Sequence, residues 1–153
     1  MSMNKSIAKA LIAYIVKNYP DAYDGLTKTK LMKLVFLVDY EYYRRYKRTL
    51  TGATYVKYFY GPFSKEIAEI LDEMVAHDLI QMESGISSSG NIYYVYKPTL
   101  LTEQLTHVVE KDPQIKRIVD SVIRENIAPL EKILEKVYAI RKVKKSDFLE
   151  RIL

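Results

Sequence analysis

The stretch that decides the fold is residues 29–64, with the sequence TKLMKLVFLVDYEYYRRYKRTLTGATYVKYFYGPFS. Over residues 29–47 the apolar side chains recur at helical spacing, which predicts a helix. Met32, Phe36 and Leu37 widen this apolar stripe almost to a full ring. We therefore expect a helix that is buried on several sides.

The second half of the stretch predicts a strand and a sharp corner. Gly52 ends a polar turn, and residues 55–60 are rich in aromatic and β-branched side chains, which is typical of a strand. Gly61 and Pro62 are expected to stop that strand, because proline cannot donate a hydrogen bond to a neighbouring strand. Ser64 is placed to cap the helix that follows.

The flanking sequence adds helices and one β-hairpin. Residues 5–19 and 64–77 each have the periodicity of an amphipathic helix. Residues 79–83 and 92–97 predict the two strands of a hairpin, joined by a polar tip rich in serine and glycine. After Pro98 the chain has helical periodicity throughout.

Three polar or proline positions mark helix boundaries in this last part. Asp112 followed by Pro113 is typical of a helix start. Pro129 suits the first turn of another helix. Ser146 is expected to cap a short last helix.

Together these elements predict an α+β fold that is mainly helical. Its helices are expected to surround a small β-hairpin or three-stranded sheet in a winged-helix-like arrangement, with a helical C-terminal extension. We expect a boundary at Pro98, which divides the chain into a mixed part, residues 1–98, and a helical part, residues 99–153.

The composition narrows the classes of protein. With 153 residues the chain has the size of a single domain with a sizeable core. No apolar run approaches the roughly 20 residues of a membrane-spanning helix, so no membrane association is expected. The absence of cysteine excludes disulfides and thiolate chemistry and is typical of a cytoplasmic protein. The net charge of +5 is dispersed, so it permits acidic partners without indicating them.

The sequence offers little for an enzyme. His77 and His107 are the only histidines, and neither has a partner at the spacing of a metal site. Asp39 and Glu41 lie two residues apart on the predicted helix, so they point to different faces. A buried hydrogen-bonding role is expected for Asp39. We predict no catalytic residue, no metal ligand and no cofactor.

Tyrosine is the most informative residue type. The chain has 14 tyrosines, and seven of them lie within residues 40–60. Because tyrosine combines a large apolar ring with a polar tip, it suits half-buried positions and protein interfaces. We expect about half of the tyrosines to line the core. The predicted partner-binding residues, which include neighbouring basic and aromatic side chains, are Tyr43, Tyr46, Tyr58, Tyr60, Phe63, Arg44 and Arg45.

A winged-helix-like order of elements leaves a DNA-binding regulator as the alternative function. Nucleic-acid contacts would then come from basic residues at helix ends, where they also complement the helix dipole: Arg48, Lys142, Lys144 and Lys145. The helix that would enter the major groove, residues 65–78, carries five acidic residues and one lysine. These carboxylates would repel the phosphates, so DNA binding is disfavoured.

Five motifs together resemble the SocA-like, or Panacea, antitoxin domain family. The resemblance covers residues 5–97, and its motifs are Lys-Leu-x-Lys-Leu at 30–34, Asp39-Tyr40, Leu50-Thr51-Gly52, Tyr55, and Tyr-Gly-Pro-Phe-Ser at 60–64. At Tyr58 the chain departs from the family, whose members often carry a tryptophan three residues before the Gly-Pro pair.

The resemblance implies a non-enzymatic role. Members of this family neutralise a toxin by binding it, and they either mask the toxin or present it to a protease. A protein partner, a toxin, is therefore expected here. The sequence identifies neither the toxin nor the oligomeric state, and a homodimer stays open.

Overall fold

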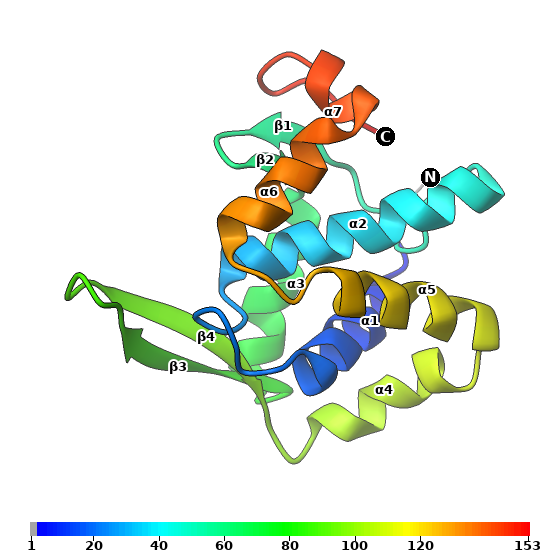
Figure 1. Ribbon diagram of the computed structural model, residues 1–153. Coiled ribbons are helices and arrows are strands. Elements are labelled where there is room, and N and C mark those ends of the chain that lie inside the picture. Colours follow the sequence, from blue (N-terminus) through cyan, green and yellow to red (C-terminus); the bar gives the residue numbers. More distant parts are fainter. Residues whose placement is uncertain (1–2) are drawn as a thin grey trace.

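A computed structural model describes residues 3–153 of the protein (Figure 1). This part of the chain forms seven helices and two small antiparallel sheets, so the predicted α+β, mainly helical class is confirmed. The helices are α1 (Lys5–Asn18), α2 (Lys28–Tyr46), α3 (Lys65–Ala76), α4 (Thr102–Glu110), α5 (Pro113–Glu125), α6 (Leu130–Ala139) and α7 (Arg141–Lys145). The strands are β1 (Val56–Tyr58), β2 (Gly61–Phe63), β3 (Ile80–Ile86) and β4 (Ile92–Pro98).

Helix α2 lies at the centre of the molecule, with α1, α5, α6 and β2 packed against it (Figure 1). The predicted burial on several sides is confirmed, because every residue from Lys30 to Asp39 is buried. Thr27 caps the helix by accepting a hydrogen bond from the backbone N–H of Lys30. The helix ends at Lys47, whose φ of 62° is left-handed.

Buried residues on both sides of Pro98 belong to one hydrophobic core. Helix α4 packs along α1, and α5 and α6 both contact α2. The division into residues 1–98 and 99–153 stays a prediction about folding units.

The expected strand over residues 55–60 is wrong in detail. β1 covers only Val56–Tyr58, and Gly61-Pro62 begins a second strand that pairs antiparallel with the first, with Pro62 opposite Lys57. Gly61 allows the tight turn because its φ is +89°, a backbone conformation that residues with a Cβ atom disfavour. A proline is tolerated here because β2 is a short edge strand.

The one hairpin that was predicted, β3–β4, is confirmed and is longer than expected. β3 and β4 pair from Ile80 opposite Pro98 to Ile86 opposite Ile92. Its two strands project from the body of the molecule and end in the polar tip (Figure 1). The two hairpins form separate sheets, so no three-stranded sheet combines them in the described part of the chain.

Two of the predicted caps are confirmed and one is wrong. Ser64 caps α3 through its hydroxyl group, and Asp112 caps α5 with Pro113 in the first turn. Ser146 instead lies at the C-terminal end of α7, where its hydroxyl group donates to the carbonyl oxygen of Lys142. No helix follows it, because residues after Ser146 turn back towards β1.

None of the helices in residues 3–153 is long and apolar enough to cross a bilayer.

Candidate protein-binding surface at the first hairpin

Two buried lysines of α2 hold neighbouring loops through backbone carbonyl groups. Lys30 donates a hydrogen bond of 2.8 Å from Nζ to the carbonyl oxygen of Tyr23. One turn further on, Lys33 donates from Nζ to the carbonyl oxygen of Pro62, also at 2.8 Å. Both side chains are at most 3% exposed. The Lys-Leu-x-Lys-Leu motif therefore fixes the loop before α2 and the hairpin after it.

Asp39 is the centre of a buried hydrogen-bond network that positions β1. Its carboxylate accepts from the backbone N–H of Thr51 at 2.9 Å, and from the hydroxyl groups of Thr51 and Tyr55 at 2.6 Å each. Burial raises the pKa of Asp39, against the hydrogen bonds, which lower it. The predicted hydrogen-bonding role is confirmed, and the network fixes the loop that leads into the hairpin.

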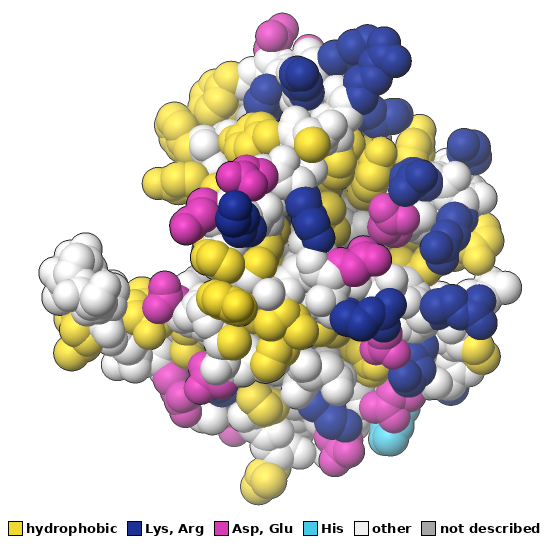
Figure 2. All heavy atoms as spheres, in the orientation of Figure 1, with side chains coloured by type: hydrophobic (Ala, Val, Ile, Leu, Met, Phe, Trp, Pro, Cys, Tyr) yellow, Lys and Arg dark blue, Asp and Glu magenta, His cyan; other side chains and the backbone are white. Residues whose placement is uncertain are grey.

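The hairpin presents a cluster of aromatic rings, here called the hairpin aromatic surface: Tyr58, Phe59, Phe63 and Phe148. The ring of Phe148 stacks on that of Tyr58, with centroids 5.8 Å apart, and lies 5.1 Å from that of Phe59. Phe59 is 69% exposed and Phe148 is 54% exposed. Figure 2 shows hydrophobic side chains gathered at the upper left, where Figure 1 places this hairpin.

The C-terminal residues hold Phe148 in place by pairing with β1. The N–H of Leu149 donates to the carbonyl oxygen of Lys57, and the N–H of Lys57 donates to the carbonyl oxygen of Glu150. Ile152 donates to the carbonyl oxygen of Tyr55 and buries its own side chain. Two segments about 90 residues apart in sequence therefore form one surface.

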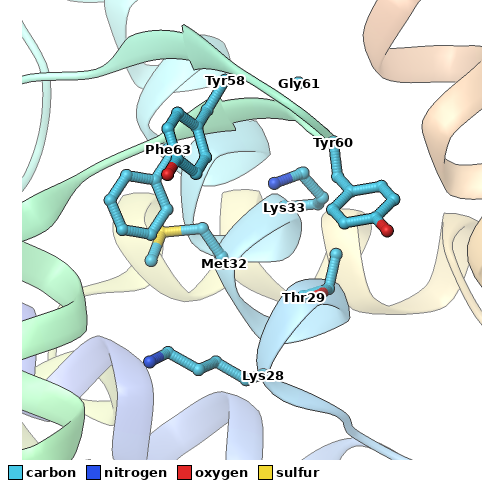
Figure 3. A pocket seen from close by; sticks show the side chains of 8 residues that line it. All are labelled: Lys28, Thr29, Met32, Lys33, Tyr58, Tyr60, Gly61 and Phe63. Carbon is cyan, nitrogen blue, oxygen red and sulfur yellow. The ribbon is translucent and has the colours of Figure 1, made fainter.

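Beneath the hairpin lies an open cavity of about 140 Å³, with walls that are mostly apolar. Its lining comes from α2 and the hairpin: Lys28, Thr29, Met32, Lys33, Tyr58, Tyr60, Gly61 and Phe63. Figure 3 shows the Lys33 amine between the ring of Tyr60 on one side and the rings of Tyr58 and Phe63 on the other. Burial lowers the pKa of Lys33 to about 8.

The structure divides the predicted partner-binding residues into two groups. Tyr58, Tyr60 and Phe63 lie at the hairpin and the cavity. Tyr43, Tyr46, Arg44 and Arg45 lie at the other end of α2, about 15–20 Å from Lys33 at about 1.5 Å of rise per residue.

Three of the four residues in this second group, Tyr43, Arg44 and Tyr46, contact other side chains of the chain. Tyr43 accepts a hydrogen bond of 3.3 Å from Lys142, whose amine also lies 4.7 Å from the centre of the Tyr43 ring. Tyr46 donates to the side-chain oxygen of Gln114 at 2.8 Å, and Arg44 pairs with Glu41. Their partner-binding role stays a prediction, and the hairpin group has the larger exposed aromatic area.

The four residues proposed for nucleic acid are all exposed. Lys142, Lys144 and Lys145 belong to α7, and Figure 2 shows Lys and Arg side chains gathered over that helix. Arg48 follows the end of α2. Nucleic-acid binding by these residues stays a prediction.

Sequence reasoning did not single out Phe59, Phe148 or Lys33. Phe59 has a local signal, because it lies within the aromatic run that was expected to form a strand. Phe148 has none, since its neighbours on the surface are far away in sequence. Lys33 was recognised only as part of a motif, and its burial depends on how the hairpin folds over α2.

His77 and His107 are both exposed. Among residues 3–153 there is no cluster of histidine, aspartate or glutamate that could hold a metal ion.

The profile of the antitoxin SocA-like, Panacea domain family matches residues 31–148. This region begins later than the resemblance described above and continues through α4–α7, so the family domain includes the C-terminal helices and Phe148. No curated protein matches the chain. Since the matched region covers more than half of its residues, the chain belongs to the antitoxin SocA-like, Panacea domain family.

Proposed function

We propose that this chain is a non-enzymatic antitoxin that neutralises a protein toxin by binding it through the hairpin aromatic surface. Membership of an antitoxin family supports a protein partner. The single observation that carries the choice of surface is the exposed contact between Phe59 and Phe148, which joins the hairpin to the C-terminal segment.

Large apolar rings that are exposed to water carry a free-energy cost, which burial against a partner removes. Phe59 has no polar atom on its side chain, and 69% of it is exposed. Aromatic side chains supply much of the binding energy in protein interfaces, because they bury a large area with few rotatable bonds. A contiguous exposed cluster of this kind is typical of a protein-binding surface.

The rings are also held in place before a partner arrives. Lys33 binds the carbonyl oxygen of Pro62, the Asp39 network fixes the entry to β1, and residues 149–152 pair with β1. A surface that is already ordered loses little conformational entropy on binding. This arrangement supports tight binding without a chemical step.

Binding neutralises the toxin by one of two routes. The antitoxin either covers the part of the toxin that acts on its target or presents the toxin to a protease as an adaptor. The level of toxin in the cell distinguishes them, because masking leaves it unchanged and delivery to a protease lowers it.

The toxin is first identified as a small protein that co-purifies with the chain from its native host and arrests growth when it is expressed alone. The test is then rescue of growth in cells that express this protein. We expect the wild-type chain to restore growth and the double variant Phe59→Ala, Phe148→Ala to fail at equal expression. Leu100→Ala is the matched control, because Leu100 is 98% exposed and lies in the loop between β4 and α4. Full rescue by the double variant would contradict the proposal.

A further inference from the structure

The cavity beside the aromatic surface contains a buried cation that has no counter-ion among residues 3–153. Lys33 is 3% exposed, and in the described part of the chain its ammonium group makes a single hydrogen bond, to Pro62. Among the residues that the structure describes, the only other charged one that lines the cavity is Lys28, which is also cationic. Burying an ammonium group is costly unless an anion or further acceptors compensate.

The shape and lining of the cavity select an apolar group. Met32, Phe63 and the rings of Tyr58 and Tyr60 line it, and its wall is mostly apolar. Apolar cavities of about 150 Å³ bind molecules of the size of benzene. The space of about 140 Å³ is therefore sufficient for one aliphatic or aromatic side chain.

We propose that this cavity binds the C-terminal residue of the bound protein, with its apolar side chain in the cavity and its α-carboxylate paired with Lys33. This inference rests on the proposed function, because the occupant belongs to the bound toxin. Lys33 uses one of its three N–H groups on Pro62, so two remain to donate to a carboxylate.

A chain terminus fits this site better than an internal acidic residue. In an extended peptide, neighbouring side chains point to opposite faces, so an apolar residue and an adjacent aspartate do not enter one small cavity together. In a C-terminal residue the carboxylate and the side chain leave the same Cα atom. Capture of a terminal carboxylate is also a recurring mode of peptide recognition.

Met32 and the hairpin suit such a ligand in further ways. The thioether chain of Met32 is flexible and adapts to side chains of different shapes. A Cβ atom built at Gly61 would lie in ordinary van der Waals contact with Cε of Lys33, at 3.7 Å, so this part of the hairpin packs directly against the lysine side chain. The hydrogen bond to Pro62 already holds the ammonium group in the wall of the cavity.

The test uses small probes and the full chain, with binding followed by NMR at Gly61 and at the Lys33 side chain. The probes are N-acetyl-L-leucine, which carries a free carboxylate, and N-acetyl-L-leucinamide, which does not. We expect the acid to bind at least tenfold more tightly than the amide and to raise the pKa of Lys33. Equal binding of the two probes, or no response at the cavity, would overturn the proposal.

Variants assign the effect to Lys33. In Lys33→Met the ratio of the affinities for the acid and the amide is expected to fall close to one. Lys111→Met alters an exposed lysine at the end of α4 and should leave this ratio unchanged. The rise in the pKa of Lys33 is measured in the wild-type chain, so it decides the question even if Lys33→Met fails to fold. Tighter binding of N-acetyl-Leu-Asp-amide than of N-acetyl-L-leucine would contradict the terminal carboxylate.

These results are separable from those of the proposed function. If the acid probe fails to bind while toxin rescue still depends on Phe59 and Phe148, only the cavity proposal is wrong. If the acid probe binds but no rescue occurs, the cavity binds terminal carboxylates and the antitoxin proposal is wrong.

Discussion

The side-chain amine of Lys33 donates a hydrogen bond of 2.8 Å to the backbone carbonyl oxygen of Pro62, and this bond joins the centre of α2 to the hairpin that carries the aromatic surface. Because proline has no N–H to donate, Pro62 can form backbone hydrogen bonds only through its carbonyl oxygen, and the partner of that oxygen is a side chain of α2. The position of the binding surface therefore depends on a charged residue in the interior.

The burial of Lys33 predicts how stability depends on pH. Its pKa is about 8 in the folded chain and 10.5 when exposed, so the unfolded chain binds more protons between these values. The free energy of unfolding contributed by Lys33 therefore rises from pH 8 to 10.5, by about 3 kcal/mol in total. Below pH 8 the lysine is charged in both states, and its full cost is present.

Denaturant unfolding of the wild type and of Lys33→Met at several pH values measures this effect. The wild type should gain stability relative to Lys33→Met between pH 8 and 10.5. Other titrating groups contribute to both proteins and largely cancel in the difference. A difference that does not change with pH would contradict the burial of the ammonium group.

The Asp39 network predicts the effect of removing one hydroxyl group. Tyr55→Phe keeps the buried ring and removes its hydrogen bond to the side chain of Asp39, which costs about 2 kcal/mol of unfolding free energy because a buried acceptor loses a partner. Tyr94→Phe is the matched control, since Tyr94 is 55% exposed, and it should change stability by less than about 0.5 kcal/mol. Urea unfolding compares them, and equal effects would show that the network adds little.

The pairing of the C-terminal segment with β1 predicts a change in hydrogen exchange. Deletion of residues 148–153 removes the carbonyl group of Glu150 that accepts from the N–H of Lys57. We expect the Lys57 amide to exchange at least tenfold faster in the truncated chain. Phe148→Ala should leave that protection intact, because the backbone bonds do not require the ring. Unchanged exchange after truncation would argue against this pairing.

The central helix was predictable because its signals are local. Apolar residues at helical spacing indicated burial, and the capping residues Ser64 and Asp112 act on their own helices within three positions. Ser146 was wrongly expected to begin a helix. It lies instead at the C-terminal end of α7, where its backbone N–H donates to the carbonyl oxygen of Val143. Whether a serine begins or ends a helix depends on the conformation of the residues that follow it.

The binding surface was only partly predictable because it depends on tertiary packing. Tyr58 and Tyr60 stood out in an aromatic run, as did Tyr43 and Tyr46. In the folded chain the two pairs lie at opposite ends of α2, which the sequence pattern does not reveal. Phe148 reaches Tyr58 because the chain returns to the hairpin after α7. Gly61-Pro62 was expected to end a strand. In the structure it begins β2, and the hydrogen bond from Lys33 to the carbonyl oxygen of Pro62 holds this turn against α2.

Hydrogen–deuterium exchange of the chain alone and in complex with its purified toxin tests the hairpin aromatic surface most directly. We predict new protection in residues 56–63 and 147–151, which contain this surface. The β3–β4 tip, residues 87–91, should exchange equally in both states. Protection confined to the C-terminal end of α2 and to α7, with the first hairpin unchanged, would contradict this prediction.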